Sequence, residues 1–536
     1  MIKYTPASDR SLALFRSPFE QELDPDNRWV QMAGLVAWDD MAKIFFSRMS
    51  PDQGRASIDL RVVLGALLVK HIEDLSDEDT IGYIQENIYA QYFVGLSSFQ
   101  TDAVFVPHLF VEIRKRLGKE GVQKLNDELL KHARNLRAIR HRAKVVGKNQ
   151  GRCDGSGEYG WGDSSTGASQ DNPGQGGEAH QESTPPNRGT LKLDATVAPQ
   201  HVGYPTDTKL LHQGRLYSEG LIDRLYLGSG LWDKKPRTYR RVAHKQYLVF
   251  AKKRNPTKRE IARTRAKQLR YLRRNLGHIN RMLDELAQVG QHVPWQLNHW
   301  HRLWVLGELY RQQQLMHEGG HKRIDHRIVN IAQPYVRPIK RGKAGKQTEF
   351  GAKLNMSETE GFVRMDQLSF DNFNEGTYLQ QQVKGYRDLY GYYPELILVD
   401  KIYLNRENRK FLKEKGIRHS GKPLGKAPQW SYAQMQKRRK EQNKRSEIEG
   451  KFGQAKSKYG LDHIKTRRKD TSYAHIGLIL MALNIIKLGG VVFLLILMAF
   501  DRLWKKVNQT KAQLNHIFEA KRMIGLRNQN TPAPVT

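Results

Sequence analysis

Three acidic residues, far apart along the chain, stand in settings that suit metal-dependent phosphoryl chemistry. Asp194 lies in the segment LKLDATVAPQ, Asp400 ends the apolar run LILVD, and Glu449 lies in the segment KRSEIEGKFGQAKSKYG. Carboxylate oxygens suit Mg²⁺, and carboxylates held close together repel one another unless a cation lies between them. The three residues therefore predict a nuclease-like site that holds two magnesium ions against a phosphodiester.

Two short strands are expected to position the aspartates. The run LILVD is apolar on both faces and stops at Asp400, and ligand-binding groups collect at the carboxyl ends of strands in open α/β sheets. Asp194 follows Leu193 and points to the opposite face of its strand. If the two strands are neighbours, the carboxylates converge. The alternative role for Asp400 is a helix N-cap for the segment that follows.

A helix is expected to position Glu449. At 100° per residue, Arg445 and Lys456 fall within about 40° of Glu449, whereas Glu447 falls on nearly the opposite side. An apolar stripe borders the Glu449 face and would pack the helix on the sheet; it consists of Ile448, Phe452, Ala455 and Tyr459. A carboxylate between two cations suits a site that binds metal and a phosphate strand together. The alternative is an ordinary surface of salt bridges.

The charge of the chain points to a polyanionic partner. Lys and Arg outnumber Asp and Glu by 89 to 55 in 536 residues, a net charge of +34. Such an excess repels itself unless it meets a polyanion, and nucleic acid fits best, with a merely basic ribosome-associated factor as the alternative. The length predicts about two or three domains. The single cysteine, Cys153, excludes an intramolecular disulfide and suits a reducing cytoplasm, and no signal peptide is evident at the start.

Residues 1–137 are expected to form a helical N-terminal domain. Ser76 and Asp79 resemble a helix N-cap pair, and a helix, the short turn LSDED and a second helix suggest a helix-turn-helix. A purely structural or dimerising bundle gives the same pattern. DNA contacts are expected from a basic group in the third helical region, namely Arg114, Lys115 and Arg116.

The composition changes at residue 138. Residues 138–188 begin with a basic run and continue with Gly, Ser, Asn, Gln and Pro, which predicts a flexible linker. From residue 189 to 500 the pattern is α/β, with strands expected at TLKLDATVA, RIVNIAQ, TEFGAKLNMS, GFVRMDQLSF and LILVD, and a helix over about 376–390.

A helical insertion is expected within this α/β domain over about 223–330. Thr257 and Glu260 form a capping-box pair. Leucines and isoleucines then recur at heptad spacing, which favours a helical hairpin packed on its own domain over an intermolecular coiled coil. The other faces carry more arginine and lysine than a solvated face needs, and Arg270 and Arg273 among them are expected to follow DNA phosphates.

An apolar stretch over residues 476–500 requires a membrane test. Asn484 and Lys487 interrupt it, and Gly489 and Gly490 divide it, so two buried core helices are expected in preference to a membrane-spanning one. Residues 501–536 are expected to form a basic helix and tail.

Three segments around the acids resemble the DDE transposases of bacterial insertion sequences, most of all the insertion sequence five family: LDATVAPQHVGYPTD, VDKIYLNRENRKFLKEKGIRHSGKPLG and RSEIEGKFGQAKSKYGL. The family signature around its third acid is Tyr, two residues, Arg, three residues, Glu, six residues, Lys. Arg445, Glu449 and Lys456 match this spacing, whereas Gln442 stands at the tyrosine position. The similarity extends over most of the chain and is weakest over 148–188.

The resemblance implies an α/β fold with a ribonuclease-H-like catalytic core, that is, a mixed sheet flanked by helices, together with a helical insertion and an all-helical N-terminal domain. Asp194, Asp400 and Glu449 would be the catalytic and metal-binding residues for two Mg²⁺ ions, for which Mn²⁺ can substitute, and Arg445 and Lys456 would contact DNA near the cut. Water would free a 3′-OH at the element's end, and that hydroxyl would attack target DNA by transesterification.

The implied partners are double-stranded DNA, from the element ends and the target, and a second copy of the chain in a homodimer that pairs two ends. No membrane is implied, and the expected location is the cytoplasm, at the nucleoid. Two other functions stay open: a DNA-binding regulator that no longer cuts, and a structure-specific nuclease of the same fold. The presence of all three acids argues against the regulator.

Overall fold

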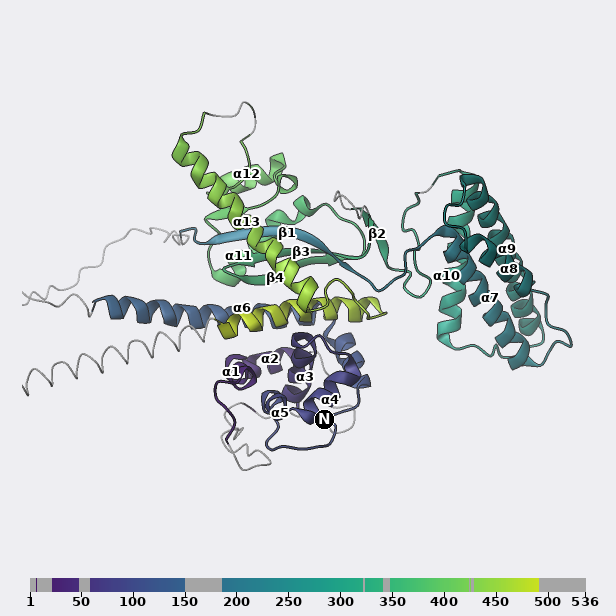
Figure 1. Cartoon of the computed structure of the whole chain (residues 1–536), viewed down its shortest axis with the longest axis horizontal. Coiled ribbons are helices and arrows are strands. Elements are labelled where there is room, and N and C mark those ends of the chain that lie inside the picture. Colours follow the sequence, from purple (N-terminus) through teal and green to yellow (C-terminus); the bar gives the residue numbers. More distant parts are fainter. Residues whose placement is uncertain are drawn as a thin grey trace, which may run out of the picture.

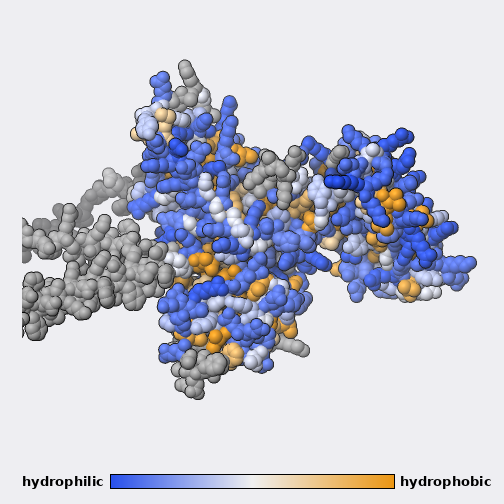
Figure 2. All heavy atoms as spheres, viewed as in Figure 1, coloured by the Kyte–Doolittle hydropathy of each residue, from blue (hydrophilic) through white to orange (hydrophobic). Residues whose placement is uncertain are grey.

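The computed structural model describes residues 22–47, 58–149, 186–321, 323–340, 348–423 and 429–490, together with Pro6 and Gly425; for residues 139–149 it describes the backbone alone. Figure 1 shows a group of N-terminal helices, a central sheet with its covering helices, and a separate helical lobe. Most of the surface on this side is hydrophilic (Figure 2). Of the linker expected over 138–188, residues 150–185 lie outside the described residues, and residues 138–149 belong to a helix; the tail expected over 501–536 also lies outside the described residues.

The N-terminal part is helical, as predicted, and packs around one buried helix. Its elements are α1 (Arg28–Leu35), α2 (Trp38–Phe46), α3 (Leu60–Ile72), α4 (Asp77–Glu86), α5 (Ile88–Val94) and α6 (His108–Asn149). Every residue of α3 is buried, because the other helices surround it. The predicted cap is confirmed, since the Ser76 hydroxyl accepts the Asp79 N–H at 3.0 Å. Residue 137, the expected end of this domain, lies inside α6.

A six-stranded mixed sheet forms the centre of the molecule. Its strands are β1 (Thr190–Pro199), β2 (Arg337–Lys340), β3 (Thr348–Thr359), β4 (Phe362–Ser369), β5 (Leu396–Leu398) and β6 (Arg418–His419). The strand order is β2-β3-β1-β5-β6, with β4 also paired to β3. β3 runs antiparallel to β1, β2 and β4, whereas β5 runs parallel to both β1 and β6. The chain is therefore α/β with a mixed sheet.

Alternation along β1 separates the two faces of the sheet. Leu191 and Leu193 pack with α11 (Leu379–Tyr390), α12 (Arg406–Glu414) and the 3₁₀ helix η4 (Lys401–Tyr403); a second 3₁₀ helix, η3 (Glu375–Tyr378), directly precedes α11. The opposite face, with Lys192 and Asp194, lies toward α13 (Tyr432–Lys458). In Figure 1, α13 crosses in front of the sheet. The predicted stripe on α13 is confirmed for Ile448, Phe452 and Ala455, which are buried against the sheet.

The helical insertion begins earlier than expected and forms the lobe at the right of Figure 1. It comprises α7 (Asp207–Ser229), α8 (Arg240–Ala251), α9 (Lys258–Gln288) and α10 (Leu297–Glu318), so it begins at Asp207 and not at residue 223. The capping box of Thr257 and Glu260 is present. The heptad residues of α9 pack mainly against α7 and α10, which confirms packing within the lobe.

One expected strand is absent. The segment RIVNIAQ (327–333) has no strand structure, although Ile328, Val329 and Ile331 are buried. Its apolar residues fill the junction between the lobe and the sheet domain, because Ile328 and Ile331 join the core of the lobe and Val329 joins the core of the sheet. Burial, and not strand pairing, explains the apolar pattern there.

The helix Lys469–Gly490 has the length and composition of a membrane span, yet 67% of its most apolar window is buried inside the structure. Its residues enter two hydrophobic cores: Leu478 and Met481 pack with the N-terminal helices, and Ile476 and Leu480 pack with the sheet and α13. It lies beside α6 in Figure 1. The helix joins the two parts of the molecule, and the rest of the apolar stretch, from residue 491, lies outside the described residues.

Candidate active site

The pairing of β1 with β5 brings two of the three predicted acids to one level of the sheet. Leu191 pairs with Ile397 and Lys192 with Leu398 in parallel register. Two more residues along each strand lead to Asp194 and Asp400, and neighbouring strands lie about 4.8 Å apart. Because Ile397 and Val399 pack on the α11 face, strand alternation directs Asp400 toward the α13 face, the same face as Asp194.

Asp194 is half-buried, and its negative charge is only partly balanced by nearby positive charge. Its Oδ1 accepts the Ala195 N–H at 2.8 Å, and its Oδ2 lies 3.8 Å from Arg445 Nη1. Burial raises the pKa of Asp194 to about 6; the Ala195 N–H and Arg445 oppose the shift, and the carboxylates of Glu375 and Glu449 add to it. A buried carboxylate with a raised pKa is one that a further cation would stabilise.

Asp400 occupies the turn between β5 and η4. It stands two residues beyond the end of β5, and it is exposed. It is also the N-cap of η4, where its Oδ1 accepts the Lys401 N–H at 2.7 Å. The cap uses one of the two carboxylate oxygens, so it does not exclude a metal-binding role.

Glu449 approaches from α13. Its Oε1 lies 3.2 Å from Arg445 Nη2, one helical turn earlier, and 52% of its side chain is exposed. The Arg445 guanidinium thus lies between Asp194 and Glu449 and bridges strand and helix. The apolar stripe of α13 holds this arrangement against the sheet.

The donor set fits divalent magnesium by its chemistry. Three carboxylates offer hard oxygen atoms, and one cation, the Arg445 guanidinium, already lies between two of them. Within the described ranges, no three His, Cys, Asp or Glu side chains are gathered closely enough to hold a metal ion as they stand. Metal binding therefore requires side-chain rotation at this site, with Arg445 turning away from between Asp194 and Glu449.

The raised pKa of Asp194 predicts a pH dependence of cation binding. Below pH about 6 the carboxyl is protonated in the metal-free protein, and a cation must displace that proton. We expect Mn²⁺ affinity to fall by up to about tenfold per pH unit as the pH drops below about 6, and to level off above it. Calorimetric titration of Mn²⁺ at several pH values measures this. Equal affinities on both sides of pH 6 would contradict the assignment of Asp194.

A buried network of hydrogen-bonded polar side chains lies beneath the site. The Tyr403 hydroxyl, three residues after Asp400, donates to Asn355 Oδ1 at 2.7 Å, and Gln382 Nε2 donates to the same oxygen at 3.2 Å. Gln382 Nε2 also donates to Asp366 at 2.8 Å. The exposed fractions of Tyr403, Asn355 and Gln382 are 0%, 0% and 1%.

This network of polar side chains continues from the sheet to the N-terminal part of the protein. Arg364 Nη1 lies 2.9 Å from Asp366, and its Nε and Nη2 donate to the two carboxylate oxygens of Asp127 on α6 at 2.7 and 2.9 Å. Burial raises the pKa of Tyr403, so the hydroxyl stays protonated and keeps its donor role. Fully buried polar groups are costly unless each is hydrogen-bonded, so this network fixes where η4 sits.

Removal of the Tyr403 hydroxyl tests that support. In Tyr403→Phe, Asn355 loses its shortest hydrogen bond at a buried position, so we expect the free energy of unfolding to fall by about 1–2 kcal/mol. Urea denaturation of the wild type and the variant measures the difference. Tyr432→Phe, which alters an exposed hydroxyl on α13, is the control. A stability equal to that of the wild type would show that the hydroxyl contributes nothing.

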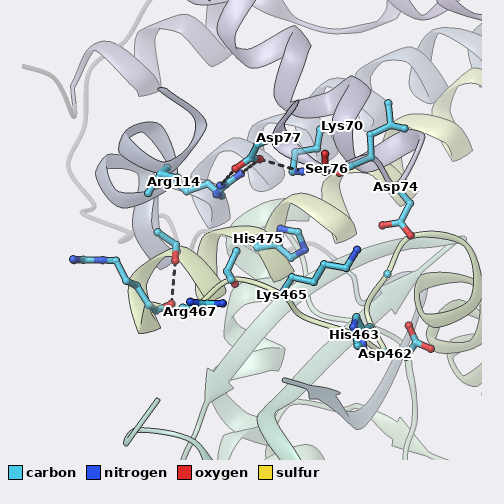
Figure 3. A pocket seen from close by; sticks show the side chains of 16 residues that line it. Lys70, Asp74, Ser76, Asp77, Arg114, Asp462, His463, Lys465, Arg467 and His475 are labelled. Atoms are coloured by element: carbon cyan, nitrogen blue, oxygen red, sulfur yellow. Dashed lines mark hydrogen bonds and ion pairs between the residues drawn. The ribbon is translucent and has the colours of Figure 1, made fainter. Parts of the chain in front are cut away.

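Arg114 does not occupy the DNA-contacting position that the sequence suggested. It is 3% exposed, and its Nη1 and Nη2 donate to the two Asp77 oxygens at 2.8 and 2.6 Å. Figure 3 shows this pair, with Lys70, above a cavity of about 490 Å³ that the loop after α13 closes from the other side. Arg114 ties α6 to the start of α4. A basic residue in a helical pattern does not reveal such a buried partner.

The other residues expected to contact DNA lie at the surface or near it. Lys115 is half-buried and pairs with Glu112 at 2.5 Å, and Arg116 is exposed on α6. Arg270 and Arg273 are exposed on α9. Lys456 is half-buried on α13, two helical turns beyond Glu449. The structure does not bring Arg270 and Arg273 to the acidic site, because α9 belongs to the separate lobe (Figure 1).

Three neighbours of the site, Lys192, Glu447 and Glu375, received no role from the sequence. Lys192 is 5% exposed, and its Nζ lies 2.6 Å from Glu447 on α13 and 2.5 Å from Glu358 on β3. Glu447, assigned no role from its helical position, therefore anchors the other flank of α13. Glu375 on η3 pairs with Lys353 at 2.9 Å and is close enough to raise the pKa of Asp194. An isolated Lys or Glu gives no local signal of such long-range partners.

Comparisons with known proteins match two stretches of the chain. Residues 17–116 match a family model described as Transposase domain (DUF772), and residues 397–489 match one described as Transposase DDE domain. The second match includes Asp400 and Glu449, and Asp194 lies outside both. No solved structure matches the chain.

One curated relative is similar to part of the chain. It is the uncharacterized protein ORF8 in the nfe locus of Rhizobium meliloti, 32% identical over 112 residues, which are 21% of this chain and 54% of the relative. The chain thus spans about half the length of that relative. The relative's description adds no activity, whereas the two family matches support an insertion-sequence transposase.

Proposed function

We propose that this chain is a DDE transposase of the insertion sequence five type, which binds the ends of an insertion sequence, cleaves the DNA by metal-dependent hydrolysis and joins the 3′-OH ends to target DNA by transesterification. The observations that support the proposal are the parallel register of β1 and β5, the strands that lead to Asp194 and Asp400, and the position of Arg445 on α13, 3.8 Å from Asp194 and 3.2 Å from Glu449. The mixed sheet flanked by helices supports a ribonuclease-H-like core.

Each residue of the site has a role that its position supports. Asp194, Asp400 and Glu449 would hold two Mg²⁺ ions, which when bound supply Lewis acidity at the attacking and leaving oxygens. Arg445 bridges Asp194 and Glu449, and its guanidinium can turn to a DNA phosphate once a cation takes its place. The Asp400 cap and the Tyr403 network hold the loop in place, so that positioning and electrostatics can supply the catalysis.

The substrates and location follow from the same proposal. Double-stranded DNA, from the element ends and the target, is a polyanion that complements the net charge of +34. A homodimer would pair two ends. The protein would act at the nucleoid in the cytoplasm. The two alternatives, a regulator that no longer cuts and a structure-specific nuclease, gain no support from the family matches, which both name transposase domains.

Lys456→Ala tests the extent of the DNA contact along α13. Because Lys456 lies on the same side of α13 as Glu449, we expect the variant to cleave more slowly and to lose about 0.9 from the slope of log affinity against log salt. Binding titrations with end DNA at several salt concentrations measure the slope. If both slope and rate equal those of the wild type, Lys456 lies outside the DNA path.

The function itself is tested by incubating the purified protein with duplex DNA from the regions flanking its gene, first with Mg²⁺ and then with EDTA. We expect nicks at the element ends that carry a 3′-OH, in Mg²⁺ only, followed by strand-transfer products when target DNA is added. Cleavage that proceeds in EDTA would refute a metal-dependent reaction. Cleavage set by DNA shape, without regard to end sequence, would favour the structure-specific nuclease.

A further inference from the structure

The first half of α13 is a helix without a buried face. The buried residues of α13, namely Ile448, Phe452 and Ala455, all belong to its second half. Over residues 432–446 most side chains are exposed, including 74% of Tyr432 and 50% of Met435. In Figure 1 this half extends past the sheet toward α12. A helix that is polar all round gains little from burial, so its presence calls for another partner.

This half is nevertheless held firmly along one flank. Ser431 and Gln434 form a capping box at its start. The Arg438 guanidinium donates to the Ser420 and Gly421 carbonyls at 3.2 and 3.1 Å and lies 4.0 Å from the centre of the Trp430 ring. Glu441 pairs with Arg418 at 3.4 Å. These polar anchors fix the direction of the helix and leave its opposite side open.

The open side carries amide groups between cations. At 100° per residue, Gln436 and Asn443 lie within about 20° of each other and about 170° from the anchored flank. Arg439 lies on one side of this pair and Lys440 on the other, each about 50° away. The side chains of Arg439, Lys440 and Asn443 have no hydrogen-bond or ion-pair partner in the described part of the chain. The Gln436 side chain donates to the Tyr432 hydroxyl at 2.9 Å.

We propose that this open side of α13 reads base edges in the major groove of duplex DNA, an inference that rests on the proposed function. The major groove is about 12 Å wide and admits one helix, and Asn and Gln amides pair in bidentate fashion with adenine. Cations on both sides of the amides meet the two phosphate backbones that border the groove. A surface that only follows one backbone would need a single stripe of cations.

The position of the helix links this reading to the acidic site. Asn443 lies six residues before Glu449, and Gln436 lies thirteen residues before Glu449. These separations correspond to about 9 and about 20 Å along the helix axis. At 100° per residue, Asn443 and Gln436 lie about 120° and about 140° around the helix from Glu449, so the amides and the carboxylate face different sides of α13. The inference therefore places one recognition element on the same rigid helix as a proposed catalytic residue.

The test is selection from a library of random-sequence duplexes in EDTA, so that cleavage plays no part. Three double variants are compared with the wild type: Gln436→Ala with Asn443→Ala, Arg439→Ala with Lys440→Ala, and Lys384→Ala with Lys410→Ala. The last pair is the control, because both lysines are exposed on α11 and α12, across the sheet from α13. All six positions are at least partly exposed, so thermal unfolding should not change.

We expect the amide variant to lose at least about fivefold preference at one or two A·T pairs, with an unchanged salt slope. The cation variant should bind all sequences more weakly and lose about 1.8 from its salt slope. The control should match the wild type. Unchanged preference and slope in both α13 variants, or a wild type without any sequence preference, would overturn the inference. A wild type that selects A·T pairs through the amides but never cuts DNA would refute the proposed function and leave the inference standing.

Discussion

Replacement of any one of Asp194, Asp400 and Glu449 by its amide should abolish strand cleavage and leave DNA binding largely intact. Each amide keeps the shape of the side chain and removes the negative charge that a divalent cation needs, so the loss is expected to reach about a thousandfold or more. Single-turnover cleavage of end DNA in Mg²⁺, next to binding of the same DNA in EDTA, measures both quantities.

The control for this series is Asp388→Asn, an exposed acid on α11 with 66% of its side chain accessible, which should cleave at the wild-type rate. A wild-type rate in any one of the three amide variants would remove that residue from the site. Equal losses of cleavage and binding would instead show that the substitutions disturb the fold or the DNA-binding surface and not the metal site alone.

Arg364→Ala should cause the largest loss of stability among single substitutions away from the acidic site. Arg364 binds Asp127 of α6 and Asp366 of β4, and the Asp366 side chain is only 5% exposed. Loss of the guanidinium leaves a buried carboxylate without its countercharge, for which about 3–5 kcal/mol is typical. Urea denaturation gives the difference in the free energy of unfolding.

Arg387→Ala, at an exposed arginine of α11 that pairs with Asp388, is the matched control and should leave stability nearly unchanged. A second variant, Asp366→Asn with Arg364→Met, removes the buried pair and should recover part of the loss, because only Asp127, whose side chain is 25% exposed, then keeps a carboxylate without its partner. If Arg364→Ala unfolds at the same urea concentration as the wild type, the network from Asp127 to Tyr403 does not join α6 to the sheet in the way described.

Local patterns in the sequence predicted the parts of the fold that local physics determines. The alternation in TLKLDATVA became β1, the predicted N-cap at Ser76 and capping box at Thr257 are present, and the leucine spacing of α9 became buried contacts within its own lobe. Each of these signals lies within a few residues of its effect. The segment RIVNIAQ shows the limit, because its apolar residues are buried at a junction without pairing as a strand.

For the candidate site, the sequence identified acid types and their order but not their surroundings. The spacing of Arg445, Glu449 and Lys456 placed all three on one side of α13, and Arg445 indeed reaches both Asp194 and Glu449. Arg114 was misassigned because its partner, Asp77, is 37 residues away in the chain. For the same reason the network from Tyr403 to Arg364 could not be foreseen, since each of its contacts depends on how strands and helices pack in three dimensions.

The central claim is that carboxylates from positions 194, 400 and 449 hold divalent cations in one place. The most direct measurement is anomalous scattering from crystals of the protein with Mn²⁺. We predict two Mn²⁺ peaks about 3.5–4 Å apart, in contact with Asp194, Asp400 and Glu449, with Arg445 turned out of the gap that it now fills. Peaks elsewhere in an otherwise unchanged fold, or one of the three carboxylates well over about a nanometre from the ions, would contradict the account.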